Sequence, residues 1–86
     1  MSETPETRLK RLTMRSSRRG IKEMDLILGG FARHGLAGLD AASLDLYEVL
    51  LEENDHDLYQ WVSGQVPTPE HYLGLISTIA ENNRKS

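Results

Sequence analysis

The sequence predicts an all-α fold, a small bundle of about five short helices. Apolar residues recur at intervals of three and four along most of the chain, no segment alternates apolar and polar residues for long, and β-branched residues are sparse. We expect a single domain over 1–86 with frayed tails at 1–7 and 82–86. Its core should be thin, because a chain of 86 residues buries only about 60–65% of its unfolded surface.

The first helix is expected between a polar tail and a glycine. Residues 1–7 are polar and are predicted to fray. Leu9 and Leu12 follow at helical spacing among basic residues and predict a helix that ends near Ser17. Gly20 then interrupts the pattern, so we expect a junction there.

A second helix is predicted by one apolar stripe, formed by Ile21, Met24, Ile27, Leu28 and Phe31. The pair Gly29-Gly30 lies inside this stripe and weakens a helix by about 1 kcal/mol per glycine relative to alanine. Two alternatives therefore stay open. The helix continues through the glycines, or it ends there and Phe31 lies in a following turn.

The third and fourth helices are each predicted to start at an aspartate. Asp40 suits the N-cap of a third helix that ends in Glu52 and Glu53. Asp55 suits the N-cap of a short fourth helix, which Gly64 closes. The expected apolar faces are Leu44, Tyr47, Leu50 and Leu51 in the third helix, and Leu58, Trp61 and Val62 in the fourth.

The fifth helix has the clearest start signal. Thr68-Pro69-Glu70 combines a capping hydroxyl, a proline suited to the first helical position and an acid in the first turn. Its apolar face is predicted to be Tyr72, Leu75, Ile76 and Ile79. The last residues, 82–86, are expected to fray.

Charge is distributed unevenly along the chain. Residues 1–34 hold eight Lys/Arg against four acids, whereas residues 35–86 hold two against nine, for a net charge of −3. This polarity favours an oriented encounter with a charged partner, although solvated helix faces would look the same. A nucleic-acid reader would usually be basic overall, so with a pI of 5.5 we expect no nucleic acid as partner. No apolar stretch approaches the ~20 residues needed to span a bilayer, so we expect no membrane insertion.

The sequence contains no recognisable catalytic, metal-binding or phosphate-binding motif. The chain has no cysteine, and His34, His56 and His71 lack the spacing of a zinc motif. There is no nucleophile-elbow sequence, and Gly29-Gly30 lacks the lysine and preceding strand of a phosphate loop. We therefore expect no catalytic, metal-binding or cofactor-binding residues, and a protein that is not an enzyme.

The candidate binding site is the unit Arg19-Gly20-x-x-Glu23. As a helix-surface ion pair, Arg19 and Glu23 would contribute only about 0.2–0.5 kcal/mol, less than a glycine in a helix costs. A bare backbone beside two charges instead favours close approach by a partner. We expect Arg19→Ala to weaken binding and leave the fold intact. Large residues at Gly20 should harm binding more than alanine does, unless the glycine serves only a positive φ.

Two blocks carry a resemblance to a known family. The run from Arg18 to Ala32 and the run from Leu50 to Trp61 resemble the succinate dehydrogenase assembly factor 2 family, also called SdhE or FAD assembly factors. The family's hallmark is Arg-Gly-x-x-Glu followed by an apolar helix, and then Asp-Pro-Asp-Leu-aromatic-x-Trp. This chain has His56 where many members have proline, and it lacks an aromatic residue near Met14.

The resemblance implies a five-helix bundle that binds the flavoprotein subunit of succinate dehydrogenase, sometimes also fumarate reductase. There it would promote covalent attachment of FAD, holding no cofactor of its own. The family motif maps onto Arg19, Gly20 and Glu23. We expect a monomer when free and, without a convincing transit peptide, a cytoplasmic location in a bacterial-type chain. The alternatives are an antitoxin-like protein, since some members were once annotated so, and a small helical nucleic-acid-binding regulator.

Overall fold

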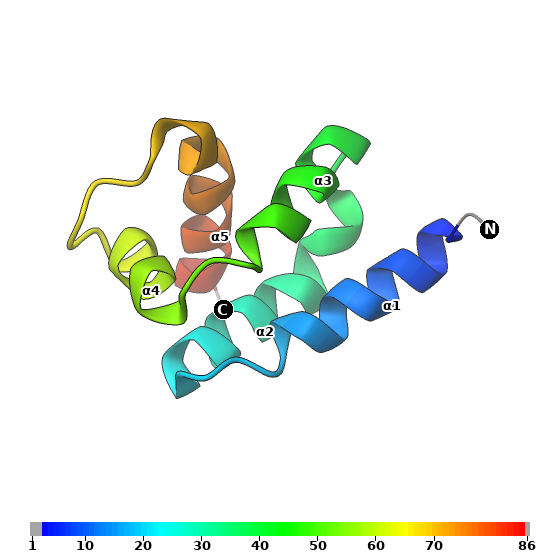
Figure 1. Ribbon diagram of the computed structural model, residues 1–86, viewed down its shortest axis with the longest axis horizontal. Coiled ribbons are helices and arrows are strands. Elements are labelled where there is room, and N and C mark those ends of the chain that lie inside the picture. Colours follow the sequence, from blue (N-terminus) through cyan, green and yellow to red (C-terminus); the bar gives the residue numbers. More distant parts are fainter. Residues whose placement is uncertain (1–2, 86) are drawn as a thin grey trace.

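A computed structural model describes residues 3–85 of the chain. Within that range it consists of five α-helices and two 3-10 turns, without a strand, and confirms the predicted all-α class (Figure 1). The elements are α1 (Pro5–Ser16), α2 (Lys22–His34), η1 (Leu36–Gly38), α3 (Ala41–Leu50), α4 (Asp55–Ser63), η2 (Glu70–Tyr72) and α5 (Leu73–Lys85).

Helix α2 is the centre of the bundle. It packs against α1, α4 and α5, and α3 packs against α5. In Figure 1, α2 turns back along α1, and α1 extends to one end of the molecule's longest dimension. The overall extents are 40 × 25 × 24 Å. The loop between α1 and α2 therefore lies at the inner end of α1, beside the rest of the bundle, and not at its projecting tip.

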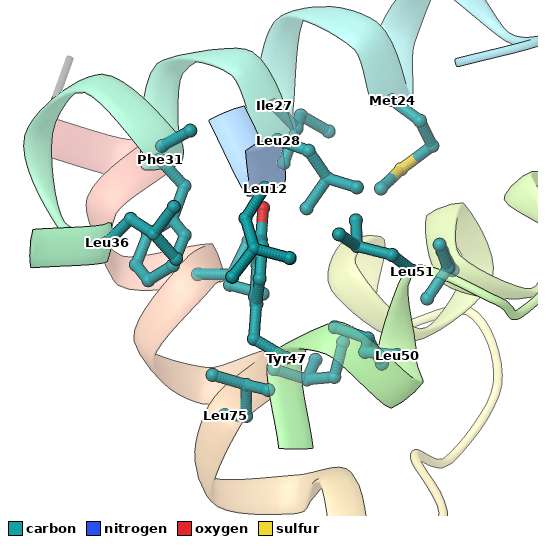
Figure 2. Packing of buried hydrophobic residues seen from close by; sticks show 14 of the residues in the cluster. Leu12, Met24, Ile27, Leu28, Phe31, Leu36, Tyr47, Leu50, Leu51 and Leu75 are labelled. Carbon is teal, nitrogen blue, oxygen red and sulfur yellow. The ribbon is translucent and has the colours of Figure 1, made fainter. Parts of the chain in front are cut away.

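Each of the five helices contributes to one apolar core (Figure 2). The rings of Phe31 and Tyr47 lie 5.6 Å apart between α2 and α3. Burying one such side chain stabilises a fold by about 1.5–3 kcal/mol, so a core this small depends on nearly every member. The buried apolar residues are Leu12, Met24, Ile27, Leu28, Phe31, Ala32, Leu36, Tyr47, Leu50, Leu51, Leu58, Tyr72, Leu75, Ile76 and Ile79.

Core burial decides between the two alternatives for α2. The helix continues through Gly29-Gly30 and ends at His34. Phe31 is only 1% exposed and belongs to the core. Burying this ring and its neighbours outweighs the propensity cost of about 1 kcal/mol per glycine.

The helix ends differ from the expected tails. Helix α1 begins at Pro5, because the Thr4 hydroxyl accepts a hydrogen bond from the Thr7 N–H at 3.1 Å and proline suits the first helical position. The tail expected through residue 7 is thus helical from residue 5; residues 1 and 2 lie outside the described range. Helix α5 continues to Lys85, where Glu81 pairs with Arg84. Of the tail expected at 82–86, only residue 86 lies outside that range.

The start signal at Thr68-Pro69-Glu70 produces a 3-10 turn and not the first turn of an α-helix. Pro69 is the N-cap of η2, and its carbonyl accepts from the Tyr72 N–H at 3.0 Å. Helix α5 follows directly at Leu73. The element was predicted in the right place, but its first turn is wound more tightly, which brings Tyr72 into the core.

One polar pair lies inside this core. The Tyr47 hydroxyl and Ser16 Oγ are 2.6 Å apart, and Ser16 Oγ donates to the Leu12 carbonyl at 2.7 Å. Both residues are fully buried. Burial is the main cause that raises the pKa of Tyr47 above its usual value. The pair joins α1 to α3 and satisfies the phenol without water.

We expect Ser16→Ala to destabilise the fold by about 1–3 kcal/mol, because it leaves a buried phenol without a partner. Adding Tyr47→Phe should recover part of that loss, since both polar groups are then absent. Urea unfolding of wild type, both single variants and the double variant measures this coupling. Strictly additive losses would contradict it.

Candidate partner-binding site

The candidate site lies in the loop that joins α1 to α2. Ser17 is the C-cap of α1, and Ile21 is the N-cap of α2. Arg19 and Gly20 therefore lie in the loop, and Glu23 lies in the first turn of α2. The ion pair between Arg19 and Glu23 on one helix, considered from their spacing, is not formed, because Arg19 is not part of that helix.

Arg19 instead bonds to the junction between α3 and α4. Its Nε donates to Asp55 Oδ1 at 2.5 Å, and its two terminal nitrogens donate to the carbonyls of Leu51 at 2.9 Å and Glu53 at 3.1 Å. Those carbonyls follow the last turn of α3, where backbone acceptors lack helical partners and a cation is favoured. The side chains of Arg19 and Asp55 are only 10% and 15% exposed. Arg19 thus has an internal structural role that the sequence did not indicate.

Gly20 shares the same carboxylate. Its N–H donates to Asp55 Oδ2 at 2.6 Å, so Asp55 holds two consecutive loop residues. A Cβ at Gly20 would lie 3.2 Å from that oxygen, closer than most real contacts. Among residues 3–85 only Gly64 has a positive φ, so the reading that Gly20 serves a positive φ is wrong. We call Arg19, Gly20, Leu51, Glu53 and Asp55 the latch.

The latch also explains a wrong assignment of the α4 cap. Asp55 was expected to cap this helix, but Asn54 does so, its Oδ1 accepting from the His56 N–H at 2.8 Å. Asp55 is the first residue of the helix, and both its oxygens are taken by Arg19 and Gly20. Its charge still lies at the positive end of the helix dipole.

Tyr72 supports the latch through Glu53. Its hydroxyl donates to Glu53 Oε2 at 2.8 Å, while the Glu53 carbonyl accepts from Arg19. Burial, together with the adjacent Glu53 carboxylate, raises the pKa of Tyr72 to about 12. The Trp61 ring lies 5.7 Å from the Tyr72 ring, and Trp61 packs against the core while remaining partly exposed. The expectation that Trp61 lies on the apolar face of the fourth helix agrees with this packing.

Glu23 is exposed and free of the latch. In the part of the chain that the structure describes, its carboxylate makes no hydrogen bond or ion pair. It lines a groove of about 320 Å³ together with Leu26 and Tyr59. Leu26 is 64% exposed, so a carboxylate and an apolar side chain lie together at the start of α2.

A second, larger groove runs along the outer face of α1. Its volume is about 590 Å³, and Met14, which is 56% exposed, lies in it. Arg19 lines this groove as well as forming the latch. The lining residues are Thr7, Lys10, Arg11, Met14, Arg15, Arg18 and Arg19. Sequence reasoning did not identify this groove. The spacing of Thr7, Arg11, Met14 and Arg18, at intervals of three and four residues, could have indicated a shared surface.

The described residues offer little for other chemistry. No group of three or more His, Asp or Glu side chains among residues 3–85 is placed to hold a metal. Over the same range, no helix is long and apolar enough to cross a membrane. The three candidate residues are close in sequence but make different contacts. Arg19 and Gly20 bind Asp55, whereas Glu23 is exposed to solvent.

The sequence matches a model of the family described as flavinator of succinate dehydrogenase over residues 10–83. That range covers the latch, Glu23 and most of the α1 groove. The chain belongs to this family. Similar proteins are named succinate dehydrogenase assembly factor 2, which agrees with the resemblance drawn from the two sequence blocks.

Individual relatives support the same assignment. The chain is 42% identical to succinate dehydrogenase assembly factor 2 of Schizosaccharomyces japonicus, over 83% of this chain and 50% of that protein. It is 41% identical to the protein of the same name in Meyerozyma guilliermondii, over 93% of this chain and 65% of that protein. It is 40% identical to succinate dehydrogenase assembly factor 2-A of Drosophila persimilis, over 99% of this chain and 54% of that protein. This family member therefore spans about half to two thirds of the length of these relatives.

The comparison corrects the expected location. A cytoplasmic, bacterial-type chain was expected, but the relatives are named mitochondrial proteins and come from eukaryotes. The expectation is therefore wrong on this comparison, which points to mitochondria. The misleading signal was the composition of the first twenty residues, where two acids and the lack of an apolar segment argued against targeting.

Proposed function

We propose that this chain binds the flavoprotein subunit of succinate dehydrogenase and promotes covalent attachment of FAD to it. The observation that carries the proposal is the family match over residues 10–83. The geometry adds a loop held by internal hydrogen bonds, with Gly20 exposed, beside two grooves, which suits a docking surface. The chain would act as a helper without catalytic residues or a cofactor of its own.

The mechanism follows from what flavinylation requires. The flavin and the acceptor side chain of the partner must be held in reactive geometry, and orientation alone can supply several kcal/mol. A helper that binds only the competent conformation of the flavoprotein would shift its population toward that conformation. A rigid surface does this best, because little order has to be imposed on binding.

Each of the three candidate residues then has its own role in binding. Arg19, with its guanidinium bonded inside the chain, fixes the shape of the loop. Gly20 leaves the backbone uncovered at an exposed position. Glu23 presents a carboxylate with no partner among the described residues and would receive a cation of the flavoprotein.

The proposal is tested with purified apo-flavoprotein subunit and FAD, with and without this chain. Covalent flavin is read as fluorescence that stays with the flavoprotein band after denaturing electrophoresis. We expect the chain to form a complex with the subunit and to increase the rate of flavin incorporation. No complex and no acceleration at micromolar concentrations would overturn the proposed function.

Glu23→Gln should weaken binding to the flavoprotein by about 10- to 150-fold, the loss expected for one charge-assisted hydrogen bond. The melting temperature should fall only slightly, because the exposed Glu23 carboxylate has no partner within the described chain and interacts only with the dipole of α2. Glu70→Gln, at another exposed carboxylate in a first helical turn, is the matched control. Equal affinities of both variants and wild type would remove Glu23 from the site.

A further inference from the structure

The groove on the outer face of α1 has an unusual lining. It contains five cationic side chains and no acidic one, with the exposed Met14 among them. Leu12 and Ser16, on the opposite face of the same helix, are fully buried. Helix α1 thus has one face in the core and a second face that nothing in the described chain covers.

The cations in this groove are not equivalent. Arg11 pairs with Glu3 and Glu48, and Arg15 pairs with Glu52. Lys10 and Arg18 form no ion pair among the described residues.

These two free cations lie one four-residue step before and after Met14 in sequence, and all three line the groove. The result is an apolar contact point flanked by two available positive charges.

From this arrangement we infer that the α1 groove binds an acidic segment of the flavoprotein partner, with an apolar side chain between its carboxylates. The inference rests on the proposed function and adds a second contact to it. Charge complementarity selects the acidic residues, and Met14 selects the apolar one, since methionine adapts its shape to the side chain it meets.

The spacing narrows the segment further. Four residues at a rise of 1.5 Å place Met14 about 6 Å from Lys10 along the α1 axis, whereas Arg18 lies beyond the C-cap Ser17, in the loop. An extended chain advances about 3.3 Å per residue, so a carboxylate that reaches Lys10 would lie about two residues from the apolar side chain that meets Met14. A second carboxylate on the other side of that apolar side chain would reach Arg18.

A protein segment fits this groove better than a nucleic acid does. The acids that neutralise Arg11 and Arg15 lie beside the groove, and the whole chain carries a net charge of −3. A polyanion would extend past the two free cations onto these acids and be repelled. A short segment with two carboxylates would not.

Arg19 joins the groove to the proposed docking loop. Its side chain lines the groove while its guanidinium forms the latch. One partner surface can therefore cover the loop and the groove together, and the flavoprotein is the occupant to which the inference commits.

The first test reverses the two free charges in Lys10→Glu/Arg18→Glu. The control is Arg33→Glu/Lys85→Glu, which changes the net charge equally at two exposed positions outside the groove. Calorimetric titration with the apo-flavoprotein subunit should show at least about tenfold weaker binding for the groove variant. The control should stay within about threefold. The groove variant should also lose part of the salt dependence of binding.

The outcomes separate the two proposals. If wild type does not bind the subunit, the proposed function fails and this inference fails with it. If wild type binds and the groove variant binds equally well with an unchanged melting temperature, only the groove inference is overturned. The inference would also be overturned if wild type bound free FAD or a labelled oligonucleotide tightly, and the Lys10→Glu/Arg18→Glu variant lost that binding while its affinity for the flavoprotein stayed unchanged.

The second test places a photo-crosslinking amino acid at Met14. The expected product joins it to a flavoprotein peptide with acidic residues on both sides of the attachment point. Attachment to a peptide without acids, or no crosslink in a complex that forms at full affinity, would overturn the inference.

Discussion

Arg19→Ala is expected to destabilise the fold by about 2–4 kcal/mol, a large share of the stability of a domain this small. The substitution leaves Asp55 as a nearly buried carboxylate without its cation and removes the donors to two carbonyls at the end of α3. Breaking a fully buried pair costs about 3–5 kcal/mol, and the residual exposure of both partners lowers that figure.

Chemical denaturation of five variants tests this prediction: Arg19→Ala, Arg18→Ala, Arg19→Lys, Asp55→Ala and the Arg19→Ala/Asp55→Ala double variant. Arg18→Ala is the matched control. The Arg18 side chain is exposed and makes no hydrogen bond or ion pair in the described chain, so this variant should unfold like wild type. Arg19→Lys should be intermediate, because one ammonium cannot reach three acceptors in a fixed fork. In a double-mutant cycle, Arg19→Ala should cost much less once Asp55 is alanine.

An Arg19→Ala variant as stable as wild type would contradict the latch. It would also restore the expectation, made from the sequence, that this substitution spares the fold and affects binding alone. Because instability by itself would lower flavinylation, affinity must be measured below the transition, where every variant is folded.

Substitutions at Gly20 are expected to reduce covalent FAD incorporation in order of size, with alanine least harmful and leucine and arginine most. An alanine methyl would lie 3.2 Å from Asp55 Oδ2, so the carboxylate has to move by a few tenths of an ångström. That should change stability by no more than about 1 kcal/mol, because alanine also reduces the entropy of the unfolded chain. Larger side chains cannot be accommodated so easily and should cost about 1–3 kcal/mol.

The origin of the alanine effect can be isolated. In an Asp55→Ala background the close contact is absent, so Gly20→Ala should no longer destabilise the protein. Flavinylation should still fall with side-chain size in that background if a partner approaches the loop. Equal flavinylation by all Gly20 variants, at saturating concentrations of folded protein, would end the docking argument for this residue.

The sequence determined the helices because their information is local. Apolar residues at intervals of three and four, Asp40 as a cap and Gly64 as a stop predicted elements that the structure contains. Glycines inside α2 were ambiguous, since propensity and burial oppose each other there and only the packed core shows that burial wins.

The position of the candidate site could also be read from the sequence. Arg19-Gly20-x-x-Glu23 was selected because a glycine beside charges is costly unless close approach requires it, and close approach does occur at Gly20. The residue that approaches is Asp55 of the same chain, 35 positions later. No spacing rule connects residues so far apart, so local reasoning assigned Asp55 to a cap and Arg19 to a partner.

The sequence by itself determined an all-α domain, its helix order and the loop that matters, because these follow from periodicity, capping and glycine placement within a few residues. Only the tertiary structure decided what the loop is bonded to. It placed Arg19 against the open carbonyls of α3 and the Asp55 carboxylate, and left Glu23 and Met14 uncovered. That outcome depends on how α1 and α2 pack against the α3–α4 junction. A charge that is removed from water there is costly unless it is paired and hydrogen-bonded.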